Sequence, residues 1–409
     1  MKKILYSIYT GEYPNESTGG PNNIIYKIIR NATAGNFSFD YLSKDLFARN
    51  LNNINVDSII NKRTPKKKIT AYLANNLKIY RKIFGSDFYL PYHFVKNERY
   101  FKSFQKKIKN YHILHSHDSV SLALLTDKNQ INVKKIMTVH SKGPLSDELK
   151  EIPKSKKIKN RIDTKIKAIE LKNVELADLI TFPSIAAKVF FEESLNISLK
   201  DKVKIIYNGI DFSKISELQD NEILRKYSID KKNKLLFINI AANAPEKKLN
   251  VLLRVLGLLK NKFNKEILLL NIGTEKKIAN EYRNIIKEMY LQSDVKFLGK
   301  LPNEDVIKLL KSTDILIMTS EKVIFDLVVL EAMAAGTCCV VSNEGGNKEI
   351  ITDGENGFLI DIADVDAIAK KIISILPYKD KVRENAIKTA RQFSVQKMVN
   401  EYFEVYKNV

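Results

Sequence analysis

Residues Phe325–Ile360 read FDLVVLEAMAAGTCCVVSNEGGNKEIITDGENGFLI, and the order of residue types in this stretch decides the fold. A short helix is predicted to open near Phe325 and to end at Gly336, because glycine is the usual residue just past a helix. The apolar run from Cys338 to Val341 predicts a buried strand, and the pair Gly345-Gly346 predicts a turn. A helix that leads directly into a buried strand is typical of a parallel sheet flanked by helices.

The start of this predicted helix offers a site for an anion. A helix N-terminus after a tight loop presents free backbone N–H groups and the positive end of the helix dipole, which suits a phosphate. Glu331 lies about two turns into the helix, where its carboxylate can reach hydroxyl groups beside a phosphate. The segment therefore predicts a ligand with both phosphates and hydroxyls, and a sugar nucleotide is the first such ligand to consider.

Strand and helix patterns alternate along the whole chain. In the first half, strands are predicted at 3–9, 37–42, 113–117, 135–140, 179–183 and 203–207, and helices at 22–34 and 158–176. In the second half, strands are predicted at 235–240, 267–272, 295–298, 315–319 and 338–341, and helices at 250–262, 279–290, 303–311 and 326–335. The region 45–110 is basic, aromatic and predicted to be mostly helical.

The length of 409 residues fits two domains better than one. The alternation predicts an α/β fold of two Rossmann-like parallel-sheet domains facing a cleft, with ligands at the carboxyl ends of the strands. We assign the first domain to 1–207 and the second to 208–383. A last helix within 384–409 is a candidate to pack back on the first domain.

The net charge of +21 falls almost entirely in the first half of the chain. Residues 61–110 contain 14 basic and 2 acidic residues, interleaved with ten Tyr and Phe residues. Such a surface attracts polyanions, and we interpret it as a surface for the anionic inner leaflet of a membrane. A plain solvated surface is the alternative, because Lys and Asn are abundant throughout, and no nucleic acid partner is expected.

No apolar run reaches the roughly 18 residues that a membrane span needs. The N-terminal stretch MKKILYSIYTGEY is predicted to be a first strand, because it lacks the apolar core and cleavage site of a signal peptide. Cys338 and Cys339 are adjacent in a predicted strand, so their side chains point to opposite faces and are expected to be buried, reduced thiols. The five histidines show no ligand spacing that predicts a metal site.

Several motifs together make the chain similar to glycosyltransferase family 4. The motifs are LVVLEAMAAGT with SNEGGNKEIITDGENGFLI, STGGPNNIIYKI, ILHSHDSVSLAL, KIMTVHSKG, KVKIIYNGID, PEKKLNVLL, VKFLGKLPNEDV and STDILIMTS. No single motif is decisive, but their number and order run along the whole chain. The resemblance implies the GT-B fold, with an acceptor domain followed by a donor domain, and sugar transfer with retention of anomeric configuration.

The resemblance also implies roles for individual residues. Lys247 matches the lysine that neutralises the donor diphosphate, with Lys248 as the alternative, and a cation there would stabilise the leaving group. Glu331 matches the glutamate that holds the nucleotide ribose. His117 matches the histidine that meets the donor sugar, whereas His140, after a neighbouring strand, is a secondary candidate, and His115 is expected on the opposite face or deeper in the sheet.

Three further groups complete the implied donor site. The backbone of Lys300 and Leu301 is expected to contact the base. The helix N-terminus contributes Phe325, Asp326, Leu327 and Val328. Gly19 and Gly20 form a loop after the first strand, where the absence of a Cβ lets the backbone approach a phosphate.

Three positions depart from the family pattern. Ala242 replaces an arginine that would clamp phosphate in a bidentate way, Val323 replaces the first glutamate of a pair with Glu331, and Asp326 replaces a glycine. Glu321 could supply the missing carboxylate, or the donor could lack the hydroxyl pattern which that carboxylate recognises. A non-catalytic member that only binds its ligand is the third reading.

The resemblance therefore implies a retaining glycosyltransferase of the hexosyltransferase type that uses a nucleotide-diphosphate sugar and no metal or other cofactor. Its acceptor is expected to be a glycan, lipid-linked, in bacterial surface polysaccharide synthesis. The expected location is cytoplasmic and peripheral, on the inner face of the membrane. The alternatives are a non-catalytic GT-B protein that binds a sugar nucleotide or glycan, and an epimerase or phosphorylase on the same fold.

Overall fold

The computed structural model describes residues 1–9, 21–32, 37–43, 46–48, 98–126, 132–140, 143, 145, 156–219, 222–242, 244–273 and 280–409. The chain forms two compact units. The first comprises Met1–Tyr207 with Val399–Val409, and the second comprises Asn208–Met398. Each unit is built around its own largely parallel sheet with helices on both faces, so the predicted pair of Rossmann-like α/β domains is confirmed.

The first unit contains a seven-stranded sheet in the order β3-β2-β1-β4-β5-β6-β7. Its strands are β1 (Lys2–Ile8), β2 (Phe37–Ser43), β3 (Leu46–Ala48), β4 (Ile113–Ser116), β5 (Lys134–Thr138), β6 (Leu179–Phe182) and β7 (Val203–Ile205). All neighbouring strands pair in parallel except β3, which pairs antiparallel with β2 at the edge. This short antiparallel edge strand was not predicted, and it lies at the start of the region 45–110, which is predicted to be mostly helical.

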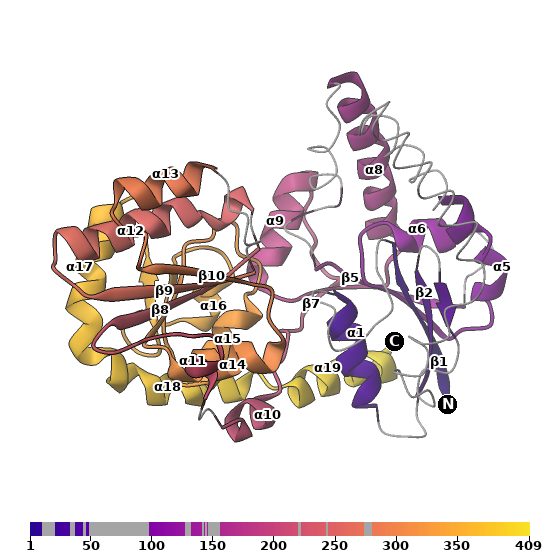
Figure 1. Ribbon diagram of the computed structural model, residues 1–409. Coiled ribbons are helices and arrows are strands. Elements are labelled where there is room, and N and C mark those ends of the chain that lie inside the picture. The colour runs from indigo at the N-terminus through magenta and orange to yellow at the C-terminus, as the bar shows by residue number, and fades with distance from the viewer. Residues whose placement is uncertain are drawn as a thin grey trace, which may run out of the picture. The chain divides into compact units, whose positions relative to one another are not determined.

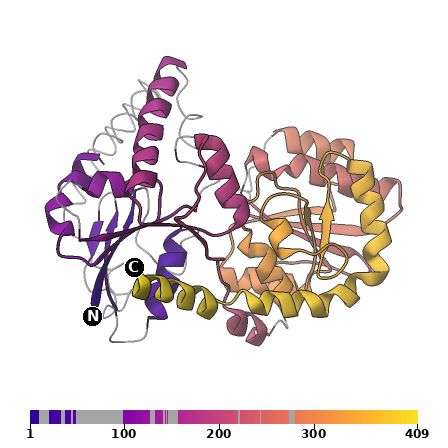
Figure 2. The ribbon, with the colours of Figure 1, turned by 180° about the vertical axis from the view of Figure 1, so that it is seen from behind.

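Helices cover both faces of this sheet. They are α1 (Pro21–Arg30), α5 (Gln105–Ile108), α6 (Ser121–Leu125), α8 (Lys156–Leu176), α9 (Ile185–Leu195) and the last turns of α19 (Val395–Asn408). Figures 1 and 2 show α1 and α19 on one side of the sheet and α6 and α8 on the other. The helix α19 is held by Lys2, whose ammonium donates to the carbonyls of Tyr406 (2.9 Å) and Lys407 (3.1 Å).

The second unit contains a six-stranded parallel sheet in the order β10-β9-β8-β11-β12-β13. Its strands are β8 (Leu235–Ile240), β9 (Ile267–Ile272), β10 (Val295–Gly299), β11 (Ile315–Met318), β12 (Cys338–Ser342) and β13 (Phe358–Ile360). Its helices are α10 (Phe212–Glu217), α11 (Ile223–Lys226), η2 (Pro245–Lys247), α12 (Leu249–Asn261), α13 (Asn280–Glu288), α14 (Asn303–Ser312), α15 (Leu327–Ala334), α16 (Asn347–Ile350), α17 (Val365–Ile375), η3 (Leu376–Tyr378) and α18 (Lys379–Gln392). The second unit extends to Met398, beyond the boundary drawn at 383, and only residues from Val399 onward belong to the first.

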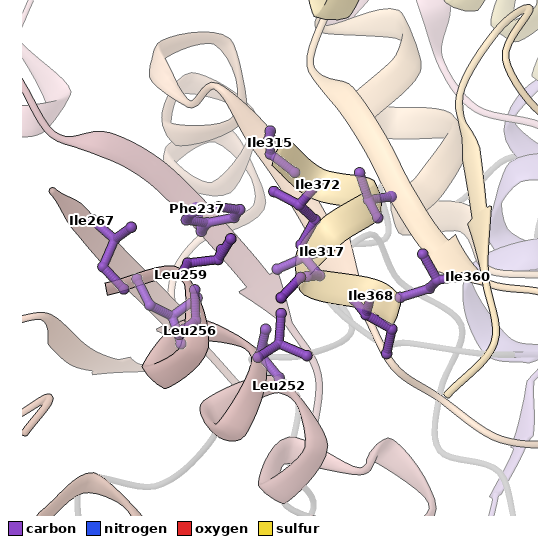
Figure 3. Close-up of a cluster of buried hydrophobic side chains, with 14 of the residues drawn as sticks. Phe237, Leu252, Leu256, Leu259, Ile267, Ile315, Ile317, Ile360, Ile368 and Ile372 are labelled. Carbon is purple, nitrogen blue, oxygen red and sulfur yellow. The ribbon is translucent and has the colours of Figure 1, made fainter. Parts of the chain in front are cut away.

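One face of the second sheet packs against α12 and α17. Leu252, Leu256 and Leu259 lie on one stripe of α12 and contact Phe237 and the other buried strand residues drawn in Figure 3. Apolar residues at such helical spacing form a single buried face. On the other face of the sheet, α15 and α18 pack against each other and against β12. Cys338 and Cys339 are buried free thiols within that strand, as predicted.

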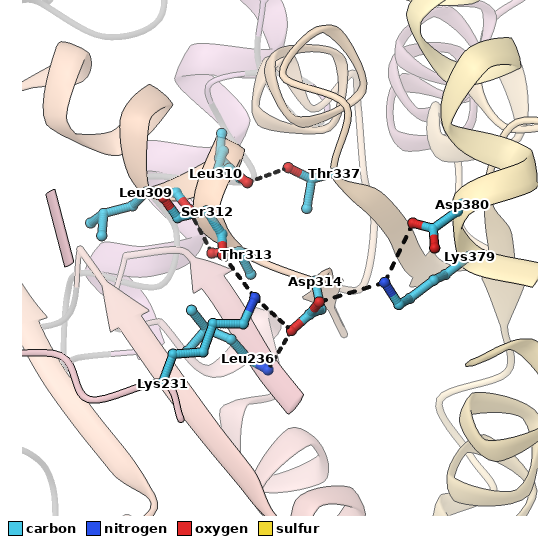
Figure 4. Close-up of polar contacts among 10 residues, drawn as sticks. All are labelled: Lys231, Leu236, Leu309, Leu310, Ser312, Thr313, Asp314, Thr337, Lys379 and Asp380. Atoms are coloured by element: carbon cyan, nitrogen blue, oxygen red, sulfur yellow. Dashed lines mark hydrogen bonds and ion pairs between the residues drawn. The ribbon is translucent and has the colours of Figure 1, made fainter. Parts of the chain in front are cut away.

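The amino ends of the central strands are fixed by a polar cluster around Asp314 (Figure 4). The carboxylate of Asp314 accepts from the backbone N–H of Leu236 at 3.0 Å and lies 3.1 Å from the ammonium of Lys231. Lys379, at the start of α18, approaches the same carboxylate at 3.6 Å. These contacts anchor β8, β11 and α18 at the end of the sheet opposite the carboxyl ends of the strands.

Candidate functional site

Each sheet has one point where the connections leave its two central strands in opposite directions, and ligands of open α/β sheets bind there. In the second unit this switch point lies between β8 and β11, which are neighbours in the sheet. In the first unit it lies between β1 and β4. The candidate residues from the sequence follow these four strands.

In the second unit, two loops at the switch point are tied together. The hydroxyl of Thr319, just after β11, donates to the carbonyls of Lys247 (3.2 Å) and Lys248 (3.0 Å) in the turn after β8. The backbone N–H of Glu321 donates to the carbonyl of Glu246 at 2.8 Å. Thr319 was not among the predicted residues, although a polar residue directly after a buried strand at the switch point is the signal that could have identified it.

The two adjacent lysines of this turn have different partners. Lys248 adopts the left-handed conformation (φ 48°), and its ammonium lies 2.9 Å from the carboxylate of Glu321. The half-buried Lys247 forms no side-chain hydrogen bond or ion pair with any residue that the structure describes. An ammonium group that has no partner among the described residues, in the turn after β8 at the switch point, is suited to an anionic ligand. Lys247, rather than Lys248, therefore fits the predicted role.

The loop after β11 contains Val323, which stands where the family has a glutamate. Val323 is 2% exposed, so its side chain is in the interior, and its carbonyl accepts from the N–H of Gly346 at 2.9 Å. A Cβ on Gly346 would lie 1.9 Å from the carbonyl oxygen of Ile324, so only glycine permits this contact. Glu321, the alternative carboxylate, is held in its pair with Lys248. The Gly345-Gly346 turn thus supports the loop that precedes α15.

The helix α15 begins at Leu327, one residue after the predicted range 326–335 and two after Phe325, near which it was expected to open. Asp326 occupies the N-cap position without a side-chain cap hydrogen bond, and Leu327 and Val328 are the first helical residues. Phe325 is 8% exposed, and its ring packs against Phe393 with centroids 5.8 Å apart. Phe325 therefore contributes to packing at this end of the helix, while the first N–H groups of the helix belong to the residues that follow.

Glu331 lies on the partly exposed side of α15, close to the start of α14. Its Oε1 atom is 3.5 Å from the side-chain amide of Asn303. Lys300 and Leu301 follow β10 directly and precede Asn303, so the segment expected to contact the base lies next to the carboxylate expected to hold the ribose. Asn303 was not predicted, and its place as the first residue of a helix that follows β10 was the available signal.

The structure does not test the glycine loop predicted for the donor site, but it does show the departure at Ala242. Gly19 and Gly20 lie outside the described residues, and so does the basic and aromatic segment up to residue 97. Ala242 is exposed, and its carbonyl accepts from the N–H of Ala244 at 2.9 Å. The position where the family has an arginine therefore carries no cation.

In the first unit, His117 and Asp118 follow β4 at the switch point. The N–H of His117 donates to the carbonyl of Ser7 at 2.8 Å, which extends the β1–β4 ladder by one bond. The carboxylate of Asp118 accepts from the N–H groups of Tyr9 (2.6 Å), Val120 (2.8 Å) and Ser121 (2.6 Å). Burial raises the pKa of Asp118, and these hydrogen bonds oppose the shift. Asp118 thus shapes the loop and holds His117 in place.

The ring of His117 is buried, and one nitrogen contacts another histidine. His117 is 1% exposed, and its Nδ1 lies 2.9 Å from Nε2 of His140, just after β5. Its other ring nitrogen, Nε2, is buried and has no hydrogen-bond partner in the described part of the chain. Burial lowers the pKa of His117 well below its usual range, and His115 and His140 add to this effect. The imidazole is therefore neutral at neutral pH.

His115 lies on the same face of the sheet as His117, and the expectation of the opposite face was wrong. Residues two apart in a strand point to one side, and the two rings are 4.2 Å apart between centroids. Both nitrogens of His115 are occupied, Nδ1 by the hydroxyl of Tyr406 at 2.8 Å and Nε2 by that of Thr138 at 2.7 Å. The other expectation, that His115 is deeper in the sheet, is confirmed, and His115 has a structural role there.

No metal arrangement is found in this cluster. Among the described residues, no group of three or more His, Cys, Asp or Glu side chains is placed to hold a metal ion. None of the described helices has the length and apolarity that would let it cross a membrane.

Two family models match consecutive parts of the chain. Residues 48–214 match the model described as Glycosyltransferase Family 4, and residues 220–393 match the model described as Glycosyl transferases group 1. Together they include β4 with His117 and the complete switch point of the second unit.

Individual proteins agree with these matches. The chain is 27% identical over 58% of its length to N-acetyl-alpha-D-glucosaminyl L-malate synthase of Bacillus anthracis, and the match covers 61% of that protein. It is 24% identical over 50% of its length to UDP-Gal:alpha-D-GlcNAc-diphosphoundecaprenol alpha-1,3-galactosyltransferase of Escherichia coli, of which 54% is covered. The chain thus spans little more than half the length of these relatives. The structure of HepE from Anabaena in complex with UDP superimposes over 100% of both chains with a TM-score of 0.70 and 18% identity, which shows a shared fold.

Proposed function

The chain belongs to the family 4 type of GT-B glycosyltransferases, and on this premise we propose that it transfers a sugar from a nucleotide-diphosphate sugar to a glycan acceptor. The observation that carries the proposal is the switch point of the second unit. There Lys247, whose side chain has no partner among the described residues, lies in a turn fixed by Thr319. The helix α15, with its N-terminus and Glu331, comes after the neighbouring strand β11. Cation, helix N-terminus and carboxylate match the diphosphate and ribose of such a donor.

In this mechanism Lys247 and the first N–H groups of α15 neutralise the charge that develops on the leaving diphosphate. Electrostatic stabilisation of this kind acts most strongly where charge appears in the transition state. Glu331 accepts hydrogen bonds from the ribose hydroxyls. The neutral imidazole of His117 offers its buried Nε2 to the donor sugar, and the transfer proceeds with retention and without a metal ion.

A panel of nucleotide sugars tests this proposal. A ligand that binds only the folded chain raises the Tm, and saturation at about 100 times Kd adds about 2.7 kcal/mol of stability. We expect at least one donor to raise the Tm of the wild type and to have little effect on Lys247→Ala. The configuration of the product at the anomeric carbon, read by NMR, then tests retention, and an inverted product would refute it.

We further propose that the acceptor is lipid-linked and that the chain works in the cytoplasm, on the anionic inner face of the membrane, in bacterial surface polysaccharide synthesis. The helix α8 supports this location. It begins with Lys156 and Lys157 and carries Arg161, and all three residues are exposed. Its first turn has no acidic residue. The three basic residues form no ion pair with a described residue. Cations at the positive end of a helix dipole are unfavourable by themselves, so an anionic partner would account for them.

The name of the Escherichia coli relative contains a diphosphoundecaprenol-linked sugar, which supports the same class of acceptor. Sedimentation with vesicles of anionic lipid tests the membrane part. We expect Lys156→Glu/Lys157→Glu/Arg161→Glu to reduce recovery with the vesicles, whereas Lys381→Glu/Lys388→Glu/Lys397→Glu, an equal change of charge on exposed residues of the second unit, should not. Equal loss in both variants, or no vesicle binding by the wild type, would refute this part.

A second candidate function is favoured by the departures from the family pattern. Ala242 provides no cation, Val323 is buried and Glu321 is engaged by Lys248, so a donor could bind without being turned over. Such a protein would bind a sugar nucleotide or glycan only. A Tm shift with a nucleotide sugar but no release of nucleoside diphosphate, with any acceptor extract, would favour this candidate.

A further inference from the structure

We propose that Lys322 is a second cation for the diphosphate of the donor, beside Lys247, and that it makes up for the charge missing at Ala242. The inference rests on the proposed function, since it concerns the same ligand at the same switch point. All three residues belong to the second unit.

The switch point of the second unit offers little positive charge to a diphosphate. In the turn after β8, Lys248 is paired with Glu321, which leaves Lys247 as the cation that no described residue engages. Ala242, in the same turn, has no charge. At the N-terminus of α15 the N-cap residue is Asp326, an acid, and its charge opposes an anion there. Because the leaving diphosphate carries more than one negative charge, a further cation would stabilise it.

The backbone of Lys322 is held next to the turn that contains Lys247. The preceding residue, Glu321, donates its N–H to the carbonyl of Glu246 at 2.8 Å, and Lys247 follows Glu246 directly. With standard backbone dimensions, the Cα atoms of Lys322 and Lys247 are then no more than about 14 Å apart. Each lysine side chain extends about 6 Å, so the two ammonium groups can approach one diphosphate from two sides.

The residue that follows Lys322 fixes the other side of this loop. Val323 is buried, and its carbonyl accepts from the N–H of Gly346 at 2.9 Å. Because both of its neighbours are fixed, the backbone of Lys322 has a defined position beyond the carboxyl end of β11. Its side chain is exposed there.

The backbone conformation of Lys322 is one that a lysine adopts only at a cost. Its φ is 50°, in the left-handed region, where the Cβ comes too close to the following carbonyl oxygen. Helices often end with such a residue, but Lys322 lies between β11 and α15 and not at the end of a helix. Glycine or asparagine would relieve this cost, so a lysine here indicates a role other than stability.

The ammonium group of Lys322 is in a position to bind a ligand. It forms no ion pair or side-chain hydrogen bond with any residue that the structure describes. Its neighbour Glu321 is paired with Lys248 at 2.9 Å, so this acid already has a cation. A lysine that is merely solvated would also be exposed, but its charge would not act on a bound nucleotide, and this difference can be measured.

Calorimetric titration of the full chain with UDP tests the proposal. Lys322→Asn removes the ammonium group and keeps the left-handed backbone, which asparagine tolerates. We expect this variant to bind UDP about fivefold to tenfold more weakly than the wild type. The loss should be smaller for UMP, which lacks the second phosphate. Lys322→Arg keeps the charge and should bind UDP as the wild type does.

A cation introduced at Ala242 tests whether the two positions compensate for each other. Ala242 is exposed, so an arginine side chain can be accommodated there. In the Lys322→Asn background, Ala242→Arg should restore the Kd for UDP to within about twofold of the wild type. A double variant that binds UDP as weakly as Lys322→Asn would overturn the proposed compensation.

Lys381→Asn is the matched control, because it removes one charge from an exposed residue of α18. This helix begins at the opposite end of the sheet, where Lys379 approaches Asp314 at 3.6 Å. UDP binding should not change in this variant. Equal losses for Lys322→Asn and Lys381→Asn would show a general effect of net charge and would overturn the proposal.

Lys322→Gly separates the charge from the backbone. Glycine relieves the left-handed conformation, so this variant should unfold at a higher urea concentration than the wild type and still bind UDP more weakly. A lysine with a structural role alone would not give this combination. Lys322→Gly also decides the question if Lys322→Asn does not fold.

The outcomes distinguish this inference from the proposed function. If the wild type binds UDP and both Lys322→Asn and Lys322→Gly bind it equally well, the inference is wrong and the proposed function stands. If the wild type binds no nucleoside diphosphate, both are wrong.

Discussion

The ammonium group of Lys248 lies 2.9 Å from the carboxylate of Glu321, and this pair joins the turn after β8 to the loop after β11. The contact assigns different tasks to two neighbouring lysines. Lys248 is engaged by the protein, whereas the side chain of Lys247 has no partner among the described residues, and we propose that it binds an anion. The same contact pairs Glu321, the carboxylate that could substitute for the glutamate missing at Val323, with a cation of the protein.

The two lysines should therefore differ in nucleotide binding. We expect Lys247→Gln to weaken binding of a nucleoside diphosphate by about 1.5–3 kcal/mol, the range for a hydrogen bond to a charged group. Lys248→Gln loses a half-exposed ion pair, which contributes about 0–1 kcal/mol. Titration calorimetry with UDP measures both. A larger loss for Lys248→Gln than for Lys247→Gln would contradict this assignment.

Glu331 should distinguish the ribose from the phosphates. Glu331→Gln is expected to weaken binding of UDP by about 1.5–3 kcal/mol and to leave binding of inorganic pyrophosphate unchanged, because only the nucleotide has ribose hydroxyls. Glu304→Gln is the matched control, since Glu304 lies on α14 next to Asn303 and its ion-pair contact with Lys214 is long, at 3.5 Å. Equal losses for UDP and pyrophosphate would show that Glu331 acts on the phosphates instead.

The Gly345-Gly346 turn gives a stability prediction. Gly346 has an ordinary φ of −65°, so alanine there meets no conformational strain but would clash with the carbonyl of Ile324. Gly299 presents the opposite case, with φ +73° and open space around its Cβ position. In urea unfolding, Gly346→Ala should lose more than the roughly 1–2 kcal/mol expected for a positive φ in Gly299→Ala. A milder effect at Gly346 would mean that the loop can move away.

The buried tyrosines of α19 give a second prediction about stability. The hydroxyl of Tyr406 bonds to His115 at 2.8 Å and to the hydroxyl of Tyr6 at 2.9 Å. Tyr406→Phe leaves both partners buried and unsatisfied, at a cost of about 1–3 kcal/mol for each. Tyr378→Phe, at a residue 59% exposed, should change the free energy of unfolding very little. Comparable urea midpoints for the two variants would show that the network adds nothing to stability.

The histidine cluster predicts a loss of stability in acid. The folded-state pKa values of His115, His117 and His140 lie below the ordinary value of 6.5, that of His140 at about 3. Between the folded-state and the ordinary pKa values, the unfolded chain binds more protons than the folded chain. The stability present above pH 6.5 is therefore lost as the pH falls toward 3. Each histidine adds up to about 1.4 kcal/mol per pH unit.

Burial raises the pKa of Asp118, so its carboxylate takes up a proton more readily in the folded chain and opposes this trend at the acid end of the range. Urea unfolding at a series of pH values should therefore show a steeper slope between about pH 6.5 and 5 for the wild type than for His140→Phe. The same slope in both proteins would show that His140 is not held neutral.

Much of the fold could be predicted because its signals are local. The apolar runs that became β8 and β9 were predicted with the observed bounds, since a buried parallel strand is a continuous apolar run. The helix α15 begins after Phe325, near which it was expected to open, and Phe325 is instead buried against Phe393 in a tertiary contact. The sequence pattern contains no information on such a contact.

The parts of the candidate site that could not be predicted depend on contacts between distant residues. A hydrogen bond between His115 and Tyr406 joins positions 291 residues apart, and no local pattern indicates it. The same holds for the pairing of Lys248 with Glu321, which decides which of two adjacent lysines is available. Residues two apart in a strand point to the same face, so the sequence alone could have placed His115 on the face of His117. The rule was applied wrongly at this position.

The most direct measurement of the central claim is the release of nucleoside diphosphate from a panel of nucleotide sugars, with wild type and Lys247→Ala compared side by side. The account predicts that the wild type releases nucleoside diphosphate from at least one donor and that Lys247→Ala, folded as judged by its urea transition, is slower by about tenfold or more. Equal rates in the two proteins, or a wild type that neither binds nor consumes any nucleotide sugar, would contradict it.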